Sequence, residues 1–206
     1  MNKRILGRAV LAGAVLGAVV ATQAAAQTAP PVRIRGTIEA VSGQDLTVKS
    51  RDGSDVKIKL APDYSVTGVA KASLSDITVG KFVGIAAMPN GSGPEKAVEV
   101  VVFPESGRGS GEGHYAWDLA PGSTMTNATI TSEVTNVDGP TLTLKHKDGE
   151  NSITVPKDVP VVTFVPGDKT LVVPGAHVMV PTTKQADGSL MAARILVGKD
   201  GVTPPM

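Results

Sequence analysis

The sequence contains two copies of one pattern, and this repeat restricts the possible folds more than any other feature. VSGQDLTVKSRDG at residues 41–53 aligns with VDGPTLTLKHKDG at residues 137–149, and seven of the 13 positions carry the same residue type at a spacing of 96. After one deletion the spacing becomes 95, so that Ile58 meets Ile153. Self-similarity at a fixed spacing indicates duplicated structural units. We therefore expect two homologous domains.

The repeat also sets the expected domain boundaries. AVEVVV from Ala97 in the first copy meets ARILV in the second, so each copy extends well beyond the aligned hairpin motif. We predict a first domain at residues 32–104, a Gly- and aromatic-bearing connecting segment at 105–126, a second domain at 127–199 and a tail at 200–206.

Each copy shows the alternation of a β-strand. In RIRGTIEA at residues 33–40, apolar or small residues alternate with charged or polar ones. A two-residue period places one face of a strand in a core and the other in water. Asp-Gly pairs at residues 52–53 and 148–149 separate the runs, and glycine tolerates the positive φ of tight hairpin turns. The pattern predicts an all-β chain of short strands.

So small a sheet is expected to close on itself, because closure removes the unpaired edges that invite aggregation. Three hairpin strands, a crossover and a final hairpin predict an OB-like barrel in each copy. KASLSDITVG at residues 71–80 favours a single helical turn in the crossover, whereas Pro and Gly in VPGDKTLVVPG at 165–175 predict its loss in the second copy. The predicted fold class is all-β: two tandem small OB-like barrels of five to six strands after an N-terminal signal peptide.

These motifs carry a family resemblance. Gly-x-Ile at residues 36–38, the LTV…DG hairpin at 46–53, Gly-x-x-Val-x-Val from Gly80 and Ala-x-x-Ile/Val in the last strand occur in this order. In this the chain resembles an uncharacterised exported bacterial domain family with tandem OB-like barrels. The resemblance covers nearly all of the chain beyond the signal sequence, and it implies a fold and an exported location but no particular chemistry.

The N-terminus predicts export. Three basic residues within the first eight precede an apolar run at residues 9–20, and Ala24-Ala25-Ala26 offers the small residues that signal peptidase reads. We predict a cleaved signal peptide at residues 1–26. The alternative is an uncleaved anchor, but a spanning helix needs about 20 apolar residues. An Ala-rich signal on a chain without cysteine favours the bacterial periplasm.

Charge and cysteine content exclude several classes. The chain has 20 Lys and Arg and 19 Asp and Glu, and loss of three basic residues with the signal leaves a slightly acidic chain. That balance does not favour nucleic acid as a partner, which calls for a basic face. The absence of cysteine excludes disulfides. No segment after the signal is long and apolar enough to predict a transmembrane helix.

The chain has no cysteine thiolates, so its three histidines are the main candidates for binding a soft or borderline metal such as zinc. His114, His146 and His177 are scattered, and none shows a His-x₃₋₅-His spacing. The positions of His146 and His177 within the strand pattern favour structural roles. GEGH at residues 111–114 is the best metal candidate, with His114 as the ligand and Asp118 as a further binding residue.

Lysines on the middle strands form another candidate surface. OB-like barrels commonly bind ligands on the face of these strands, and here the face carries Lys49 and Lys57 in the first copy and Lys145 in the second. Lysines without aromatic partners suit an anionic glycan or a lipid headgroup. The alternative, which we favour, is a solvated face that discourages edge pairing.

The single tryptophan of the chain lies in the connecting segment, close to one of only two tyrosines. We expect Tyr115, Trp117 and Leu119 to fold back between the barrels as a clasp, because an exposed tryptophan is costly unless something covers it. The alternative is an aromatic pair that stacks on a ligand such as a sugar ring.

No catalytic motif stands out, since nucleophile activation requires an oriented base and no such context occurs. We therefore expect a non-enzymatic periplasmic binding or interaction module of the cell envelope, with an unknown envelope protein or glycan as partner and no cofactor. The alternatives are a periplasmic metal-handling accessory protein that uses His114 and a hydrolase acting at the cleft between the barrels.

Overall fold

The structure is a computed structural model that describes residues 31–204, and these residues form twelve strands and three single-turn 3₁₀ helices. The strands are β1 (Val32–Ser42), β2 (Asp45–Ser50), β3 (Asp55–Lys71), β4 (Phe82–Met88), β5 (Glu95–Val102), β6 (Gly113–Ala116), β7 (Thr124–Val134), β8 (Thr141–His146), β9 (Gly149–Thr154), β10 (Val161–Pro166), β11 (His177–Lys184) and β12 (Leu190–Gly198). The helices are η1 (Leu74–Asp76), η2 (Glu105–Gly107) and η3 (Lys169–Leu171). The predicted all-β, barrel-based fold is confirmed. The predicted signal peptide at residues 1–26 lies outside the described residues.

Strands from the two ends of the described chain close into one barrel, which we call the terminal barrel. Its strand order is β12-β11-β1-β2-β3, and pairing of β12 with β3 completes the ring. Neighbouring strands are antiparallel except β12 and β3, which are parallel. Alternate side chains point inward, as the two-residue period predicts. They form a core that includes Ile38, Leu46, Val48, Ile58, Leu60, Val178, Val180 and Ile195.

Strands from the middle of the chain form a second ring, the central barrel. Its order is β5-β4-β7-β8-β9, and a short parallel pairing closes it, with Glu95 opposite Ile153 and Lys96 opposite Thr154. The other neighbours are antiparallel. The core of this barrel includes Ile77, Val83, Ile85, Val100, Ile130, Leu142, Leu144 and Ile153.

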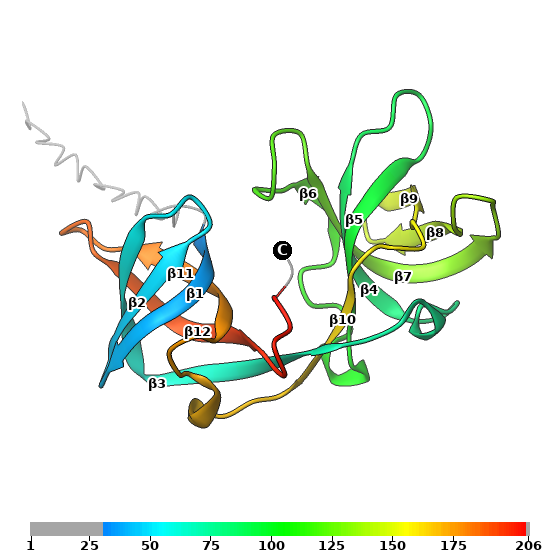
Figure 1. Ribbon diagram of the computed structural model, residues 1–206. Helices are drawn as coiled ribbons and strands as arrows, with labels where there is room; N and C mark the ends of the chain where they lie inside the picture. The colour runs from blue at the N-terminus through cyan, green and yellow to red at the C-terminus, as the bar shows by residue number, and fades with distance from the viewer. Residues whose placement is uncertain (1–30, 205–206) are drawn as a thin grey trace, which may run out of the picture.

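Each barrel takes strands from both copies of the repeat. The terminal barrel combines β1, β2 and the first part of β3 with β11 and β12, whereas the central barrel combines β4 and β5 with β7, β8 and β9. Figure 1 shows this mixture, with blue and cyan strands beside orange and red ones in one barrel. The expected division into one barrel at residues 32–104 and another at 127–199 therefore differs from the structure, because the copies exchange their last two strands.

β3 and β10 carry the chain between the barrels and pair with each other, and we call this pair the ribbon. The end of β3 also pairs with β12, and β10 also pairs with β5, so one continuous sheet runs through both barrels. β3 has 17 residues, and at about 3.3 Å per residue it spans roughly 55 Å, more than one small barrel needs. Its end at residues 67–71 pairs antiparallel with residues 162–166 of β10. Val69 pairs with Phe164, and the two residues are 95 apart, so they are equivalent positions of the two copies. An antiparallel pair of equivalent positions is related by a pseudo-twofold axis between them. The strands are exchanged because β3 continues into the other barrel instead of turning back (Figure 1).

Strand register shows an insertion that the sequence comparison misses. Thr37 pairs with Lys49 between β1 and β2, and Thr129 pairs with Lys145 between β7 and β8. The two lysines are separated by the repeat spacing of 96, whereas the two threonines are only 92 residues apart. The connection between β7 and β8 is therefore four residues longer than that between β1 and β2.

The second copy retains a short helix, so the prediction that it would be lost is wrong. η3 (Lys169–Leu171) lies 95 residues after η1 (Leu74–Asp76), at the equivalent place in the crossover. The carboxylate of Asp168 accepts a hydrogen bond from the backbone N–H of Thr170 at 2.8 Å, which caps the turn. The prolines and glycines flank this turn and do not enter it.

The connecting segment at residues 105–126 is itself ordered by pairing. It contains η2 and β6, and β6 pairs antiparallel with β7, from Gly113 opposite Asn127 to Ala116 opposite Thr124. The segment therefore extends the central barrel before it crosses to the terminal one.

Candidate functional site

The two barrels meet in an apolar cluster, which we call the inter-barrel cluster. Its buried members come from the ribbon and from both barrels, and they are Val69, Ala86, Val101, Met125, Val162, Met179 and Leu196. Five half-buried side chains pack against them, namely Phe103, Trp117, Leu119, Phe164 and Val202. Phe103 and Phe164 meet edge to face, with ring centroids 5.3 Å apart. This shared core joins the two barrels in addition to the ribbon.

Trp117 docks on this cluster from the connecting segment, with Leu119 beside it. The guanidinium of Arg33 in β1 stacks on the Trp117 ring, with Cζ 3.8 Å from the ring centroid, an attractive cation–π arrangement. The structure places Trp117 and Leu119 between the barrels, as the clasp hypothesis predicts. Tyr115 instead stands at the edge, 37% exposed, with its ring centroid 5.9 Å from that of Trp117.

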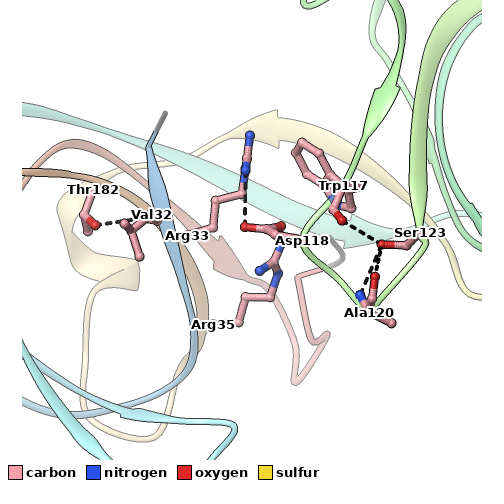
Figure 2. Close-up of polar contacts among 8 residues, drawn as sticks. All are labelled: Val32, Arg33, Arg35, Trp117, Asp118, Ala120, Ser123 and Thr182. Atoms are coloured by element: carbon pink, nitrogen blue, oxygen red, sulfur yellow. Dashed lines mark hydrogen bonds and ion pairs between the residues drawn. The ribbon is translucent and has the colours of Figure 1, made fainter. Parts of the chain in front are cut away.

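Asp118 ties the same segment to the terminal barrel by charge. One carboxylate oxygen accepts a hydrogen bond from Arg35 at 2.6 Å and the other accepts one from Arg33 at 3.2 Å, so that Asp118 lies between the two guanidinium groups (Figure 2). Burial alone would raise the pKa of the Asp118 carboxyl. The hydrogen bonds and charges of Arg35 and Arg33 outweigh it and hold that pKa below the ordinary value. Asp118 is therefore a structural ion-pair residue.

A buried serine fixes the turn that presents these residues. The hydroxyl of Ser123 lies 2.9 Å from the carbonyl oxygen of Trp117 and 2.7 Å from that of Ala120, and it accepts a hydrogen bond from the Ala120 N–H at 3.1 Å (Figure 2). The N–H of Trp117 donates to the Ser123 carbonyl at 2.8 Å. The turn from 117 to 123 is therefore held at both ends.

A pocket of about 310 Å³ lies beside Trp117, between the barrels. Two cations, Arg33 and Arg194, line it, and no Asp or Glu of the described chain does. Its walls are mostly apolar and include Phe103, Tyr115, Trp117, Met125, Phe164, Met179 and Leu196. Concave, largely apolar sites with a few polar groups are typical of small-molecule binding, at volumes of about 300–1,000 Å³.

Asn127 of β7 lies in the lining of this pocket and is only 8% exposed. Its side-chain amide donates to the carbonyl oxygens of Ser110 and Gly111, both at 3.2 Å, and lies 3.1 Å from the Tyr115 hydroxyl. Its Oδ1 is buried and has no hydrogen-bond partner in the described chain. A Cβ at Gly84, directly opposite, would come within 2.6 Å of this oxygen, so only glycine leaves room for it.

A second buried polar atom in the lining is also unpaired. The indole Nε1 of Trp117 makes no hydrogen bond within residues 31–204. Buried polar groups are nearly always paired, and each exception calls for an explanation. Beside it, burial raises the pKa of the Tyr115 hydroxyl, and the charge of Arg33 offsets this only in part. The pocket therefore combines an unpaired acceptor, an unpaired donor and a phenol that stays protonated.

A larger depression of about 810 Å³ lies beside the end of β3, but its chemistry is less specific. Charges of both signs line it, including Lys71, Lys157 and Asp158, and no aromatic ring of residues 31–204 does. The tail residues 202–204 also contribute to its wall. Its larger volume does not outweigh the concentration of aromatic and unpaired polar groups in the inter-barrel pocket.

The histidine pair near β6 is held by hydrogen bonds. The backbone N–H of Asp148 donates to Nδ1 of His146 at 3.3 Å, so in neutral His146 the proton lies on Nε2, which contacts Asn151 Oδ1 at 2.7 Å. Both nitrogens of this buried ring are therefore engaged. His114 stacks on it with ring centroids 6.4 Å apart, and its Nδ1 lies 2.8 Å from Thr126 Oγ1.

The third histidine is in the other barrel, where Nδ1 of His177 lies 3.1 Å from Thr37 Oγ1. Across the described part of the chain, no three His, Asp or Glu side chains come together in a group that could hold a metal ion. The structure therefore gives the proposed ligand His114 a threonine and a second histidine as neighbours, with no metal-binding group formed among the residues it describes.

The candidate lysines lie on outer surfaces and do not share a site. Lys49 pairs with Asp55 at 2.7 Å and with Glu39 at 3.8 Å. Lys57 is exposed on β3 of the terminal barrel, and Lys145 is exposed on β8 of the central barrel. None of these three lysines lines the inter-barrel pocket.

Of the predicted binding residues, the structure brings Tyr115 and Trp117 to this pocket, with Asp118 holding Arg33 beside it. The sequence pattern does not single out Asn127 or Arg194. The only local signal for Asn127 is a polar side chain within a strand whose neighbours are largely buried.

No protein-family model, curated protein or solved structure matches this chain. Within residues 31–204, none of the helices has the length and apolar character needed to cross a bilayer.

Proposed function

We propose that this chain is a non-enzymatic binding module of the bacterial cell envelope, exported to the periplasm, and that its binding site is the inter-barrel pocket. The signal-like N-terminus and the absence of cysteine support the location. The lining of the inter-barrel pocket holds no carboxylate and no histidine among the described residues. The groups that most often serve as general acid or base are thus absent from its walls, which supports binding over hydrolysis.

One observation carries the proposal: the pocket combines aromatic walls with two buried, unpaired polar atoms, Asn127 Oδ1 and Trp117 Nε1. Each unsatisfied buried group costs about 1–3 kcal/mol. The described residues hold four such atoms; two belong to lining residues of this pocket, and the others are Arg35 Nε and Glu95 Oε2. Asn127 Oδ1 and Trp117 Nε1 are shielded from water in this state.

The architecture suits a preformed site. The ribbon, the inter-barrel cluster and the Asp118 ion pairs hold the two halves of the pocket at once. Rigidity before binding reduces the ordering cost that a ligand must overcome. The clasp and ligand hypotheses for Trp117 are therefore compatible, because Trp117 packs against the inter-barrel cluster and also lines the pocket together with Tyr115.

A thermal-shift screen of small molecules against the exported chain tests this proposal, because a ligand that binds only the native state raises the melting temperature. The pocket-filling variant Thr67→Phe should abolish the shift, since Thr67 lines the pocket. Thr47→Phe makes the same change on β2, outside that lining, and should preserve the shift. Ligands that stabilise both variants equally would place the site elsewhere.

The same screen contains a metal arm. Zn²⁺ or Cu²⁺ stabilisation that disappears in His114→Ala would favour a metal-handling role, and its absence would leave the pocket as the site. Crosslinking in intact cells, followed by identification of the bound molecule, would then show whether an envelope protein or a glycan is the natural partner.

A further inference from the structure

We infer that the inter-barrel pocket selects a small organic anion, an apolar ring or branched group that carries a carboxylate. This inference rests on the proposed function and adds the chemical class of the ligand. Three features of the lining carry it: its charge, the apolar character of its walls and its volume.

The charge of the lining is positive. Arg33 and Arg194 line the pocket, and no acidic side chain of the described residues does. Asp118 pairs with Arg33 outside the lining, and the same carboxylate also pairs with Arg35, so it balances only one of these two positive charges. Arg194 is exposed and makes no ion pair within residues 31–204. Its guanidinium is therefore available to bind a carboxylate through two parallel hydrogen bonds.

The walls favour an apolar body over a sugar. Apolar atoms form most of the surface, and aromatic, methionine and leucine side chains are among those that line it. Methionine adapts its shape to apolar ligands. The uncharged polar side chains in the lining are few: Thr67, Ser110, Tyr115 and Asn127. The amide of Asn127 is already engaged with its own chain. A sugar ring, with a hydroxyl on most carbons, would leave many hydrogen bonds unmade, and unmade bonds cost affinity.

The volume limits the size of the ligand. At about 310 Å³, the pocket lies at the low end of the range of about 300–1,000 Å³ for ligand sites. It suits one ring with a short acidic side chain. Such a ligand can place its ring among Phe103, Phe164 and Met179 while its carboxylate reaches Arg194 at the same pocket.

Three probes separate the components of this inference: phenylacetate, its neutral isostere phenylacetamide, and inorganic phosphate. Trp117 is the single tryptophan and lines the pocket, so its emission reports occupancy directly, with melting temperature as a second readout. We expect phenylacetate to bind roughly tenfold more tightly than phenylacetamide, because a charge-assisted hydrogen bond contributes more than a neutral one. Phosphate should leave both signals unchanged.

Arg194→Gln supplies the matched test. It should weaken phenylacetate binding by about tenfold and leave phenylacetamide binding unchanged. Arg51→Gln removes the same charge at an exposed position outside this lining and should change neither.

The outcomes distinguish the two levels of the proposal. Equal binding of acid and amide would overturn the anion inference and leave the pocket as a binding site. Binding of phosphate as tightly as phenylacetate would overturn the apolar part of the inference. If no probe binds and no small molecule in the wider screen produces a shift that Thr67→Phe removes, the proposed function itself fails.

Discussion

The terminal and central barrels share one strand plan but differ where they face each other. Equivalent core positions keep their character, as Leu46 and Leu142 show at a spacing of 96. Equivalent interface positions do not. Arg35 corresponds to Asn127, Met179 to Gly84, Gly198 to Phe103 and Arg194 to Glu99 by strand register and repeat spacing.

This difference shows where the duplicated pattern was free to diverge. A closed five-stranded ring depends on its inward apolar residues, so both copies retain them. The residues where the barrels face each other need not be alike in the two copies. A single connecting segment packs there, so the equivalent positions of the two barrels have different neighbours. Gly84 lies at the position equivalent to Met179 and makes room for Asn127, and Phe103 adds an aromatic wall. The pocket therefore arises from the asymmetry of the two copies.

The most severe test of the comparison is to cut the chain between Gly109 and Ser110, which separates the two copies. Each fragment would then lack strands of both barrels, so neither should fold as a monomer, whereas an equimolar mixture should reassemble. Circular dichroism and light scattering after size-exclusion chromatography would measure folding and the 1:1 complex. Two independent tandem barrels would instead give two folded monomeric fragments, and that result would contradict strand exchange.

Matched core truncations test whether the barrels unfold together. Leu46 and Leu142 are equivalent and at most 1% exposed. Leu46→Ala and Leu142→Ala should each lower the free energy of unfolding by about 2–5 kcal/mol. Because the ribbon and the inter-barrel cluster couple the barrels, each variant should show a single transition in urea by circular dichroism and by Trp117 emission. Separate transitions in either variant would show that the barrels unfold independently.

Removal of the clasp is expected to have a smaller effect. Trp117→Ala should cost about 2 kcal/mol, less than a fully buried aromatic residue, because the ring is only half-buried. Trp117→Phe retains a ring for Arg33 and should recover much of this loss. Thermal unfolding followed by circular dichroism measures both variants. In the unmodified protein, tryptophan emission that is red-shifted and fully quenchable would contradict the clasp.

The smallest effect is expected from the ion pairs of Asp118. Asp118→Asn should lower the free energy of unfolding at pH 7 by about 1 kcal/mol or less, because the carboxylate is partly exposed. Its pKa is lowered in the folded state from an ordinary value of 3.8. The contribution is therefore complete above pH 3.8 and is lost as pH falls through the folded-state pKa. Urea titrations of both proteins from pH 7 to pH 2.5 would follow the difference, which should remain constant at neutral pH.

The sequence by itself determined the local structure. The two-residue period and the Asp-Gly turns predict strands and hairpins, because these depend on neighbours a few residues apart. The cost of exposing a tryptophan predicted that Trp117 and Leu119 lie between the barrels, as they do. The sequence pattern did not predict η3, because the Asp168 cap outweighs the helix-breaking residues around the turn.

Only the tertiary structure decided which strands share a barrel. The two copies carry the same inward pattern, so the strand pattern alone does not distinguish closure of β1, β2 and β3 by β4 and β5 from closure by β11 and β12. The continuation of β3 over 17 residues into the other barrel selects the second pairing. Strand pairing across more than 100 residues leaves no periodic signal in the sequence. Asn127, Arg33 and Arg194 converge for the same reason, since their proximity follows from the exchange of strands.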